Sequence, residues 1–172
     1  MAILEVDYAS LPRIRYSKFM KCDSVLPNLF LGPNPINEVD FAQLQAMRIT
    51  AILSLQSEDD VNQSEFLSRQ SMASERALIL HNFPVVDFDR ADLRRKLPDC
   101  VRVLDDLLKS REIVYLHCTA GVSRSPTVAA AFLHWKLGWP IDDALSHVRA
   151  VRNCCPDDEV IRSEAAHQDS GT

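Results

Sequence analysis

The chain has 172 residues, of which 47% are hydrophobic and 25% are charged, and its formal net charge is −5. This length and composition suffice for one sizeable core, which favours a single domain. The acidic balance argues against a general nucleic-acid-binding protein, because such proteins are usually basic. The longest apolar run, Val128–Leu133, is far shorter than the ~18–20 residues that cross a bilayer. We therefore expect a monomer with no nucleic-acid partner and no membrane partner.

The cysteine content indicates a reduced protein. The five cysteines are Cys22, Cys100, Cys118, Cys154 and Cys155. An odd number, in a chain that begins without the pattern of a signal peptide, argues against a disulfide framework. No Cys-x-x-Cys pair occurs, and His147 is too isolated to complete a zinc site with the last two cysteines. We expect a cytoplasmic location and no metal. A redox relay through the last two cysteines is an alternative to their simple placement in a turn.

Taken in chain order, the apolar residues predict short strands that alternate with helices. The predicted strands are two within Ser24–Leu31, then Ile49–Leu55, Ala77–Val86 and Ile113–Leu116. The predicted helices are one capped by Asn37, one near Ser64–Ala73, one from Leu93 to about Lys109, one from the residues after Cys118 to Leu137, then Pro140–Val151 and Pro156–His167. This alternation predicts an α/β fold, with a central, mostly parallel sheet flanked by helices. We expect an N-terminal extension (1–21), a single catalytic domain (22–167) and a flexible tail (168–172).

The segment with the clearest chemistry is 113–127, IVYLHCTAGVSRSPT, in which a buried strand leads to a cysteine and then to an arginine at a helix start. The backbone N–H groups of such a turn can surround one anion, with the positive end of the helix behind them. Gly121 permits an unusual backbone conformation, and Arg124 can bind two phosphate oxygens. Such surroundings lower a thiol pKa to roughly 3.5–7.5 from about 8.5. The segment therefore predicts Cys118 as a thiolate below a bound phosphate.

The sequence His117-Cys118-Thr119-Ala120-Gly121-Val122-Ser123-Arg124-Ser125 resembles the signature loop of the cysteine-dependent protein tyrosine phosphatases. The following proline makes it most similar to the dual-specificity branch, and the resemblance extends over roughly residues 22–162. It implies the fold of that family and a phosphomonoesterase that forms a thiophosphate on Cys118 without a cofactor. It also implies that Arg124 and the loop residues bind the phosphate, these being Thr119, Ala120, Gly121, Val122 and Ser123.

The resemblance further implies that Ser125 donates a hydrogen bond to the sulfur and that His117 braces the loop and helps keep the cysteine ionised. A general acid is expected on a mobile loop before the signature loop. Asp87, directly after the strand that ends at Val86, is the first choice, and Asp89 is the alternative. Asp92 is expected to cap the helix that begins at Leu93.

The compact chain implies a shallow site that accepts phosphoproteins with phosphotyrosine, phosphoserine or phosphothreonine. The alternative substrate is a phosphoglucan, because Ile49–Gln56 and Asp87–Pro98 look like segments of the glucan phosphatases related to laforin. Phe88 would then stack on a sugar ring. Ser123 and Ser125 depart from the glycine and alanine typical of those enzymes. A phosphoinositide substrate, or a module that binds phosphoproteins without turnover, are further alternatives.

Overall fold

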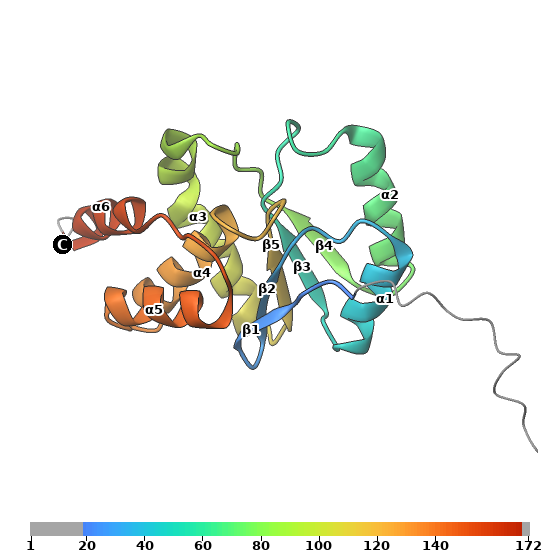
Figure 1. Ribbon diagram of the computed structural model, residues 1–172, viewed down its shortest axis with the longest axis horizontal. Coiled ribbons are helices and arrows are strands. Elements are labelled where there is room, and N and C mark those ends of the chain that lie inside the picture. Colours follow the sequence, from blue (N-terminus) through green and yellow to red (C-terminus); the bar gives the residue numbers. More distant parts are fainter. Residues whose placement is uncertain (1–18, 170–172) are drawn as a thin grey trace, which may run out of the picture.

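The computed structural model describes residues 19–169, which form a five-stranded sheet with helices on both faces (Figure 1). The strand order is β1-β2-β5-β3-β4. The strands are β1 (Asp23–Leu26), β2 (Leu29–Gly32), β3 (Ala51–Ser54), β4 (Ile79–Asn82) and β5 (Val114–His117). Only β1 runs antiparallel to its neighbour. The predicted α/β fold with a mostly parallel sheet is therefore confirmed.

The helices divide between the two faces of the sheet (Figure 1). On one face lie α1 (Glu38–Ala46) and α2 (Gln63–Ser74). On the other lie α3 (Arg90–Lys109), α4 (Arg124–Trp135), α5 (Ile141–Val151) and α6 (Asp158–Asp169). Each face has its own hydrophobic core. The molecule is thus a three-layer α/β sandwich.

The two central strands show why the sheet is buried on both sides. All four residues of β3 and all four of β5 are buried. Because successive strand side chains point to opposite faces, Ile52 and Tyr115 join the core below α1 and α2, while Leu53 and Leu116 join the other. Such unbroken apolar runs are typical of parallel strands covered by helices.

Two predicted features differ in the structure. The strand predicted over Ala77–Val86 is limited to Ile79–Asn82, and Pro84, which has no N–H for a sheet hydrogen bond, lies in the departing segment. The prediction that Asp92 caps the following helix is wrong. Helix α3 begins at Arg90, and its N-cap is Asp89, whose side chain accepts a hydrogen bond from the N–H of Asp92. Asp92 therefore lies inside the first turn and is free for another role.

The ends of the described chain also differ from the predicted boundaries. Met20, within the predicted extension, is buried in the core beside Tyr115, whose hydroxyl lies 3.4 Å from its sulfur. Helix α6 continues to Asp169, beyond the predicted end at His167. The rest of the predicted extension (1–18) and of the predicted tail (170–172) lies outside the described residues. Within 19–169, none of the helices combines the length and the apolar character that a membrane span requires.

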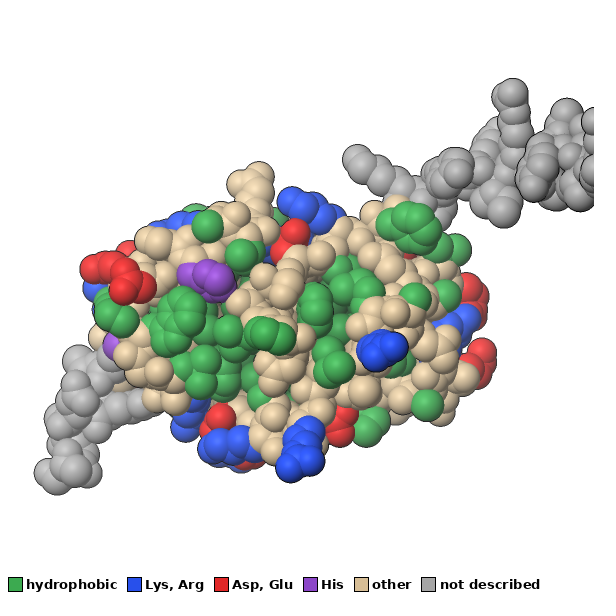
Figure 2. All heavy atoms as spheres, turned by 90° about the horizontal axis from the view of Figure 1, so that it is seen from below, with side chains coloured by type: hydrophobic (Ala, Val, Ile, Leu, Met, Phe, Trp, Pro, Cys, Tyr) green, Lys and Arg blue, Asp and Glu red, His purple; other side chains and the backbone are tan. Residues whose placement is uncertain are grey.

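The two ends of the sheet differ in character. The carboxyl ends of the parallel strands meet at the upper edge of Figure 1, where the loop after β5 enters α4. Figure 2 shows the opposite end, where apolar side chains occupy the middle and charged ones lie around the rim. A hollow of 370 Å³ at the hairpin end is lined by Leu26, Leu108, Phe132 and Leu137 among others. The polar, loop-bearing upper edge is the place to look for chemistry.

Candidate active site

The loop after the central strand β5 packs directly against the end of β2. Gly121 has a φ of +65°, a left-handed conformation. A Cβ atom on Gly121 would lie 2.3 Å from the carbonyl oxygen of Gly32 and 2.6 Å from its carbonyl carbon. Neither backbone conformation nor space admits a side chain at this position. The signature loop is therefore seated on the sheet backbone itself.

Arg152, at the end of α5, holds the back of the signature loop. Its Nε donates to the carbonyl of Gly121 at 2.6 Å, and one of its terminal nitrogens donates to the carbonyl of Ala120 at 2.9 Å. The other terminal nitrogen donates to Asp23 at 2.7 Å. Because C=O and N–H point in opposite directions across a trans peptide, these bonds turn the next two loop N–H groups away from Arg152. The guanidinium thus orients loop amides for an anion.

Cys118 lies at the bottom of this loop and is only 3% exposed. Burial raises its pKa, but the hydroxyl and N–H of Ser125, the charge of Arg124 and the N–H of Gly121 outweigh burial, so the pKa is lowered from its ordinary value. The hydroxyl of Ser125 donates to the sulfur at 3.4 Å. The predicted neighbours of the thiol are thus gathered around it, and they favour its thiolate form.

His117 contributes through geometry rather than charge. It is fully buried, and burial lowers its pKa to about 4. Its Nδ1 lies 2.8 Å from the carbonyl oxygen of Cys118, a hydrogen bond that the neutral ring makes as a donor. His117 is therefore uncharged near neutral pH and supplies no positive charge to the thiolate, while it does brace the loop backbone.

Arg124 is buried and has most of its donors engaged. One terminal nitrogen donates to Asp60 at 2.7 Å and to the carbonyl of Val85 at 2.8 Å. The other donates to Asp60 at 2.9 Å and lies 2.9 Å from a carboxylate oxygen of Asp87. Its Nε is buried and has no hydrogen-bond partner within residues 19–169. A buried donor without an acceptor is costly, so this nitrogen is suited to a ligand oxygen.

Asp60 is a site residue that the sequence did not predict. Its carboxylate accepts hydrogen bonds from both terminal nitrogens of Arg124, from the hydroxyl of Thr119 at 2.6 Å, and from the N–H of Ser57 at 2.9 Å. Burial raises the pKa of Asp60, but the bonds from Arg124 and Thr119 outweigh it and hold the pKa well below its usual range. Gln56 extends the network, since its side-chain amide donates to the hydroxyl of Thr119 at 3.0 Å.

A signal for Asp60 was present in the sequence. The polar residues 56–60 directly follow the buried strand β3, which pairs in parallel with β5. The carboxyl ends of neighbouring parallel strands share one edge of a sheet, so polar residues after β3 lie beside the loop after β5. The order of strands, which the sequence pattern does not specify, was the missing information.

The structure separates the two candidates for the general acid. Asp87 is about one-third exposed (34%) and is paired with Arg124. Asp89 instead caps α3, with its side chain accepting the N–H of Asp92 at 2.9 Å. Between them, Phe88 has a φ of +58° and a fully exposed side chain. The geometry thus brings Asp87, and not Asp89, into contact with the residues around Cys118.

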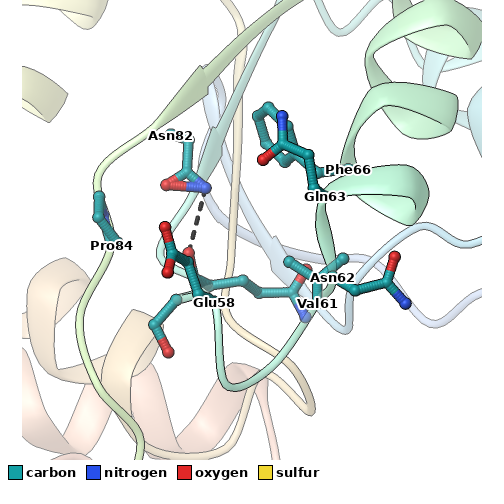
Figure 3. Close-up of a pocket in the computed structure, with 9 residues that line it drawn as sticks. Glu58, Val61, Asn62, Gln63, Phe66, Asn82 and Pro84 are labelled. Atoms are coloured by element: carbon teal, nitrogen blue, oxygen red, sulfur yellow. Dashed lines mark hydrogen bonds between the residues drawn. The ribbon is translucent and has the colours of Figure 1, made fainter.

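Two hollows lie near the residues around Cys118. A hollow of 200 Å³ adjoins Asp87, Phe88 and Arg124. A larger one, of 490 Å³, lies beside the loop between β3 and α2 (Figure 3). It is lined by Gln56, Ser57, Glu58, Val61, Asn62, Gln63, Phe66, Asn82 and Pro84. None of these nine side chains is basic, and four of them are amides, so the hollow suits an uncharged polar group better than a second phosphate.

Comparisons with known proteins agree with this geometry. The family described as "Dual specificity phosphatase, catalytic domain" matches residues 29–168. Phosphoglucan phosphatase LSF1 of Arabidopsis thaliana is 32% identical over 160 residues, 91% of this chain and 26% of that protein. Laforin of Mus musculus is 28% identical, over 85% of this chain and 48% of laforin. The chain thus spans about a quarter to a half of these relatives.

A solved structure supports the fold. The crystal structure of Tk-PTP in the active form superposes with a TM-score of 0.70 at 18% identity, over 88% of this chain and 97% of that one. At this identity the likeness concerns the arrangement of helices and strands.

Proposed function

Because the chain belongs to the family of dual-specificity phosphatase catalytic domains, we propose that it hydrolyses phosphomonoesters with Cys118 as the nucleophile. One observation supports this more than any other. A thiol with a lowered pKa, a buried arginine with an unpaired Nε, and a carboxylate in contact with that arginine meet at one loop. A nucleophile, an anion-binding group and a proton donor are what phosphoryl transfer to a cysteine requires.

In the first step the Cys118 thiolate attacks phosphorus, the S–P bond forms and the bond to the leaving oxygen breaks. Arg124 and the loop amides stabilise the charge on the transferring phosphoryl group. Asp87 gives its proton to the leaving oxygen.

In the second step water attacks the phosphorus of the thiophosphate, and Asp87, now a carboxylate, accepts its proton. The S–P bond breaks and inorganic phosphate leaves. Ser125, whose hydroxyl already donates to the sulfur, stabilises the departing thiolate. Such a nucleophile requires a reducing compartment, and we propose the cytoplasm.

Phosphate release from 4-nitrophenyl phosphate in the presence of EDTA tests this function. We expect the wild type to be active and the variant Cys118→Ser to be inactive, because a serine hydroxyl is not ionised near neutral pH. Cys155→Ser is the matched control, since Cys155 has an exposed side chain and contacts the loop through its backbone N–H. Equal activity of Cys118→Ser and Cys155→Ser would refute the mechanism.

For the substrate, a phosphoprotein is the first candidate. Ser123 and Ser125 flank Arg124 as in the protein-directed members that the loop resembles. The carboxylate of Asp87 is one-third exposed beside a hollow of only 200 Å³, so the acid is accessible from outside a shallow site. A shallow site accepts phosphate on short as well as long side chains.

A phosphoglucan is the second candidate, favoured by the exposed ring of Phe88 next to Asp87. An aromatic ring held in solvent beside an acid can stack on the apolar face of a sugar. The amide-lined hollow in Figure 3, beside the loop between β3 and α2, offers partners for sugar hydroxyls. The name of the relative phosphoglucan phosphatase LSF1 supports the same candidate.

A side-by-side measurement of phosphate release from amylopectin and from phosphopeptides distinguishes the two candidates. If a glucan is the substrate, Phe88→Ala should reduce release from amylopectin at least tenfold more than release from 4-nitrophenyl phosphate. Phe19→Ala, which removes another exposed ring, is the control. Equal losses on both substrates would remove the glucan candidate.

A further inference from the structure

The segment Pro84–Asp89, here called the acid loop, is attached to the sheet on one side. The N–H of Val85 donates to the carbonyl of Leu55, directly after β3, at 3.0 Å. The carbonyl of Val85 accepts from Arg124 at 2.8 Å. Val85 is fully buried. The residue two positions before Asp87 is therefore tied both to the sheet and to the arginine that binds phosphate.

On its other side the acid loop is attached to the first turn of α3. Asp92 is 3% exposed, and one of its carboxylate oxygens accepts the N–H of Val86, the residue immediately before Asp87, at 2.9 Å. The same oxygen lies 2.9 Å from Nζ of Lys96. Lys96 in turn donates to the carbonyl of Pro84 at 2.7 Å. The loop is thus held by one buried carboxylate and one lysine from a single helix.

Asp92 is not needed as a helix cap, because Asp89 already accepts the N–H of Asp92. A buried carboxylate costs free energy unless it is paired and hydrogen-bonded, and Asp92 meets this condition through Lys96 and the N–H of Val86. Burial raises the pKa of Asp92, but the N–H of Val86 and Lys96 outweigh burial and lower it. The carboxylate is therefore charged, and a charged acceptor makes the stronger hydrogen bond to Val86.

We propose that Asp92 is a positioning residue that holds Asp87 against Arg124 by anchoring the N–H of Val86. The proposal rests on the function proposed above, in which Asp87 protonates the leaving oxygen. Only a single peptide separates the anchored N–H from Asp87, so loss of the anchor displaces the carboxyl directly. A small displacement of a proton donor has a large effect on a step that needs proton transfer.

The test is how strongly the rate depends on the leaving group, because a residue that only stabilises the fold would lower the rate for all leaving groups equally. An alkyl phosphate has a poor leaving group that needs Asp87, whereas 4-nitrophenolate leaves with little help. We expect Asp92→Ala to lower kcat/KM for an alkyl phosphate at least tenfold more than kcat/KM for 4-nitrophenyl phosphate, because kcat/KM reports the first step and the second step is common to both substrates. Asp92→Asn should recover most of this selective loss, because the amide oxygen can still accept the N–H of Val86.

Asp105→Ala is the matched control. Asp105 is also a buried carboxylate of α3, paired with Lys109 at 2.7 Å, and it lies away from the acid loop. It should lower activity toward both substrates by the same factor. If Asp92→Ala does the same, Asp92 acts only on stability and the proposal is wrong.

Should Asp92→Ala fail to fold, Lys96→Met replaces it, because this variant removes the bond to Pro84 and one partner of Asp92 while leaving the carboxylate in place. It should show a selective loss in the same direction, and equal losses on both substrates would overturn the proposal. Failure of the proposed function is distinguishable. In that case Cys118→Ser keeps its activity, whereas failure of the positioning role leaves Cys118→Ser inactive.

Discussion

Replacing Gly121 by alanine tests whether the signature loop depends on its close packing against the backbone of β2. The cost of the left-handed backbone at Gly121 can be measured separately from the cost of steric crowding there, because the chain contains a second glycine of similar conformation. Gly138 has a φ of +72°, and a Cβ atom there would meet nothing within 4 Å. The pair Gly121→Ala and Gly138→Ala thus differs mainly in crowding.

The expected magnitudes follow from this difference. Left-handed backbone costs an alanine about 1–2 kcal/mol, and this is the whole expected loss in unfolding free energy for Gly138→Ala. At Gly121 the new Cβ would also lie 2.3 Å from the oxygen of Gly32 and 2.8 Å from a terminal nitrogen of Arg152. Overpacking typically adds about 1–3 kcal/mol. We therefore expect Gly121→Ala to lose about 2–5 kcal/mol.

Urea unfolding gives the two free energies, and inhibition by vanadate reports the anion-binding loop separately. Since the backbone of β2 cannot yield as a side chain can, the loop must shift, so Gly121→Ala should bind vanadate at least tenfold more weakly. Gly138→Ala should bind it as the wild type does. If the two variants lose equal stability and bind vanadate equally well, the steric argument is refuted.

Three further predictions concern the residues behind the loop. Arg152→Met removes one partner of a buried pair and should lower the free energy of unfolding by about 3–5 kcal/mol in urea, whereas the exposed Arg149→Met on the same helix should stay within about 0.5 kcal/mol. The pKa of Asp60 is lower in the folded protein than the unfolded value of about 4, so its stabilising contribution is present above that pH and is lost as the pH falls. In Asp60→Asn the free energy of unfolding should therefore change less between pH 5 and pH 2 than in the wild type. His117 has a folded pKa of about 4, below its ordinary 6.5, so the unfolded chain takes the proton first and stability should fall between pH 6.5 and pH 4, by about 3 kcal/mol. That slope should be absent in His117→Gln, and an unchanged slope would contradict the assignment.

Contiguous features of the site could be predicted from the sequence. The signature loop lies within nine successive residues, and its chemistry depends on local geometry that residue types and spacing express. The resemblance to the phosphatase family implies an acid directly after the strand that ends at Val86, and this favours Asp87. The prediction of a cap at Asp92 is wrong, because Asp89 accepts the N–H of Asp92 and the helix already begins at Arg90. Choosing between two carboxylates so close in sequence requires the backbone path of the acid loop.

Features that join distant parts of the chain could not be predicted. Asp60 reaches Arg124 from 64 residues away, and Arg152 reaches Asp23 from 129 residues away. In the sequence each is one charged residue among many. Their roles depend on strand order and on the direction in which α5 ends, and these are set by packing of the whole domain rather than by local propensity.

The bonds from Arg152 to the signature loop also bear on how the protein is made. Ribosomes release a chain from its N-terminus, and the nucleophile emerges 34 residues before Arg152. Until α5 has been completed and docked, the carbonyls of Ala120 and Gly121 have no guanidinium to hold them. A nascent chain that already contains the cysteine, the arginine and the acid thus still lacks an oriented set of loop amides. On the function proposed above, we expect phosphate binding to begin only once α5 has docked, so that the unfinished polypeptide is inactive toward phosphate esters.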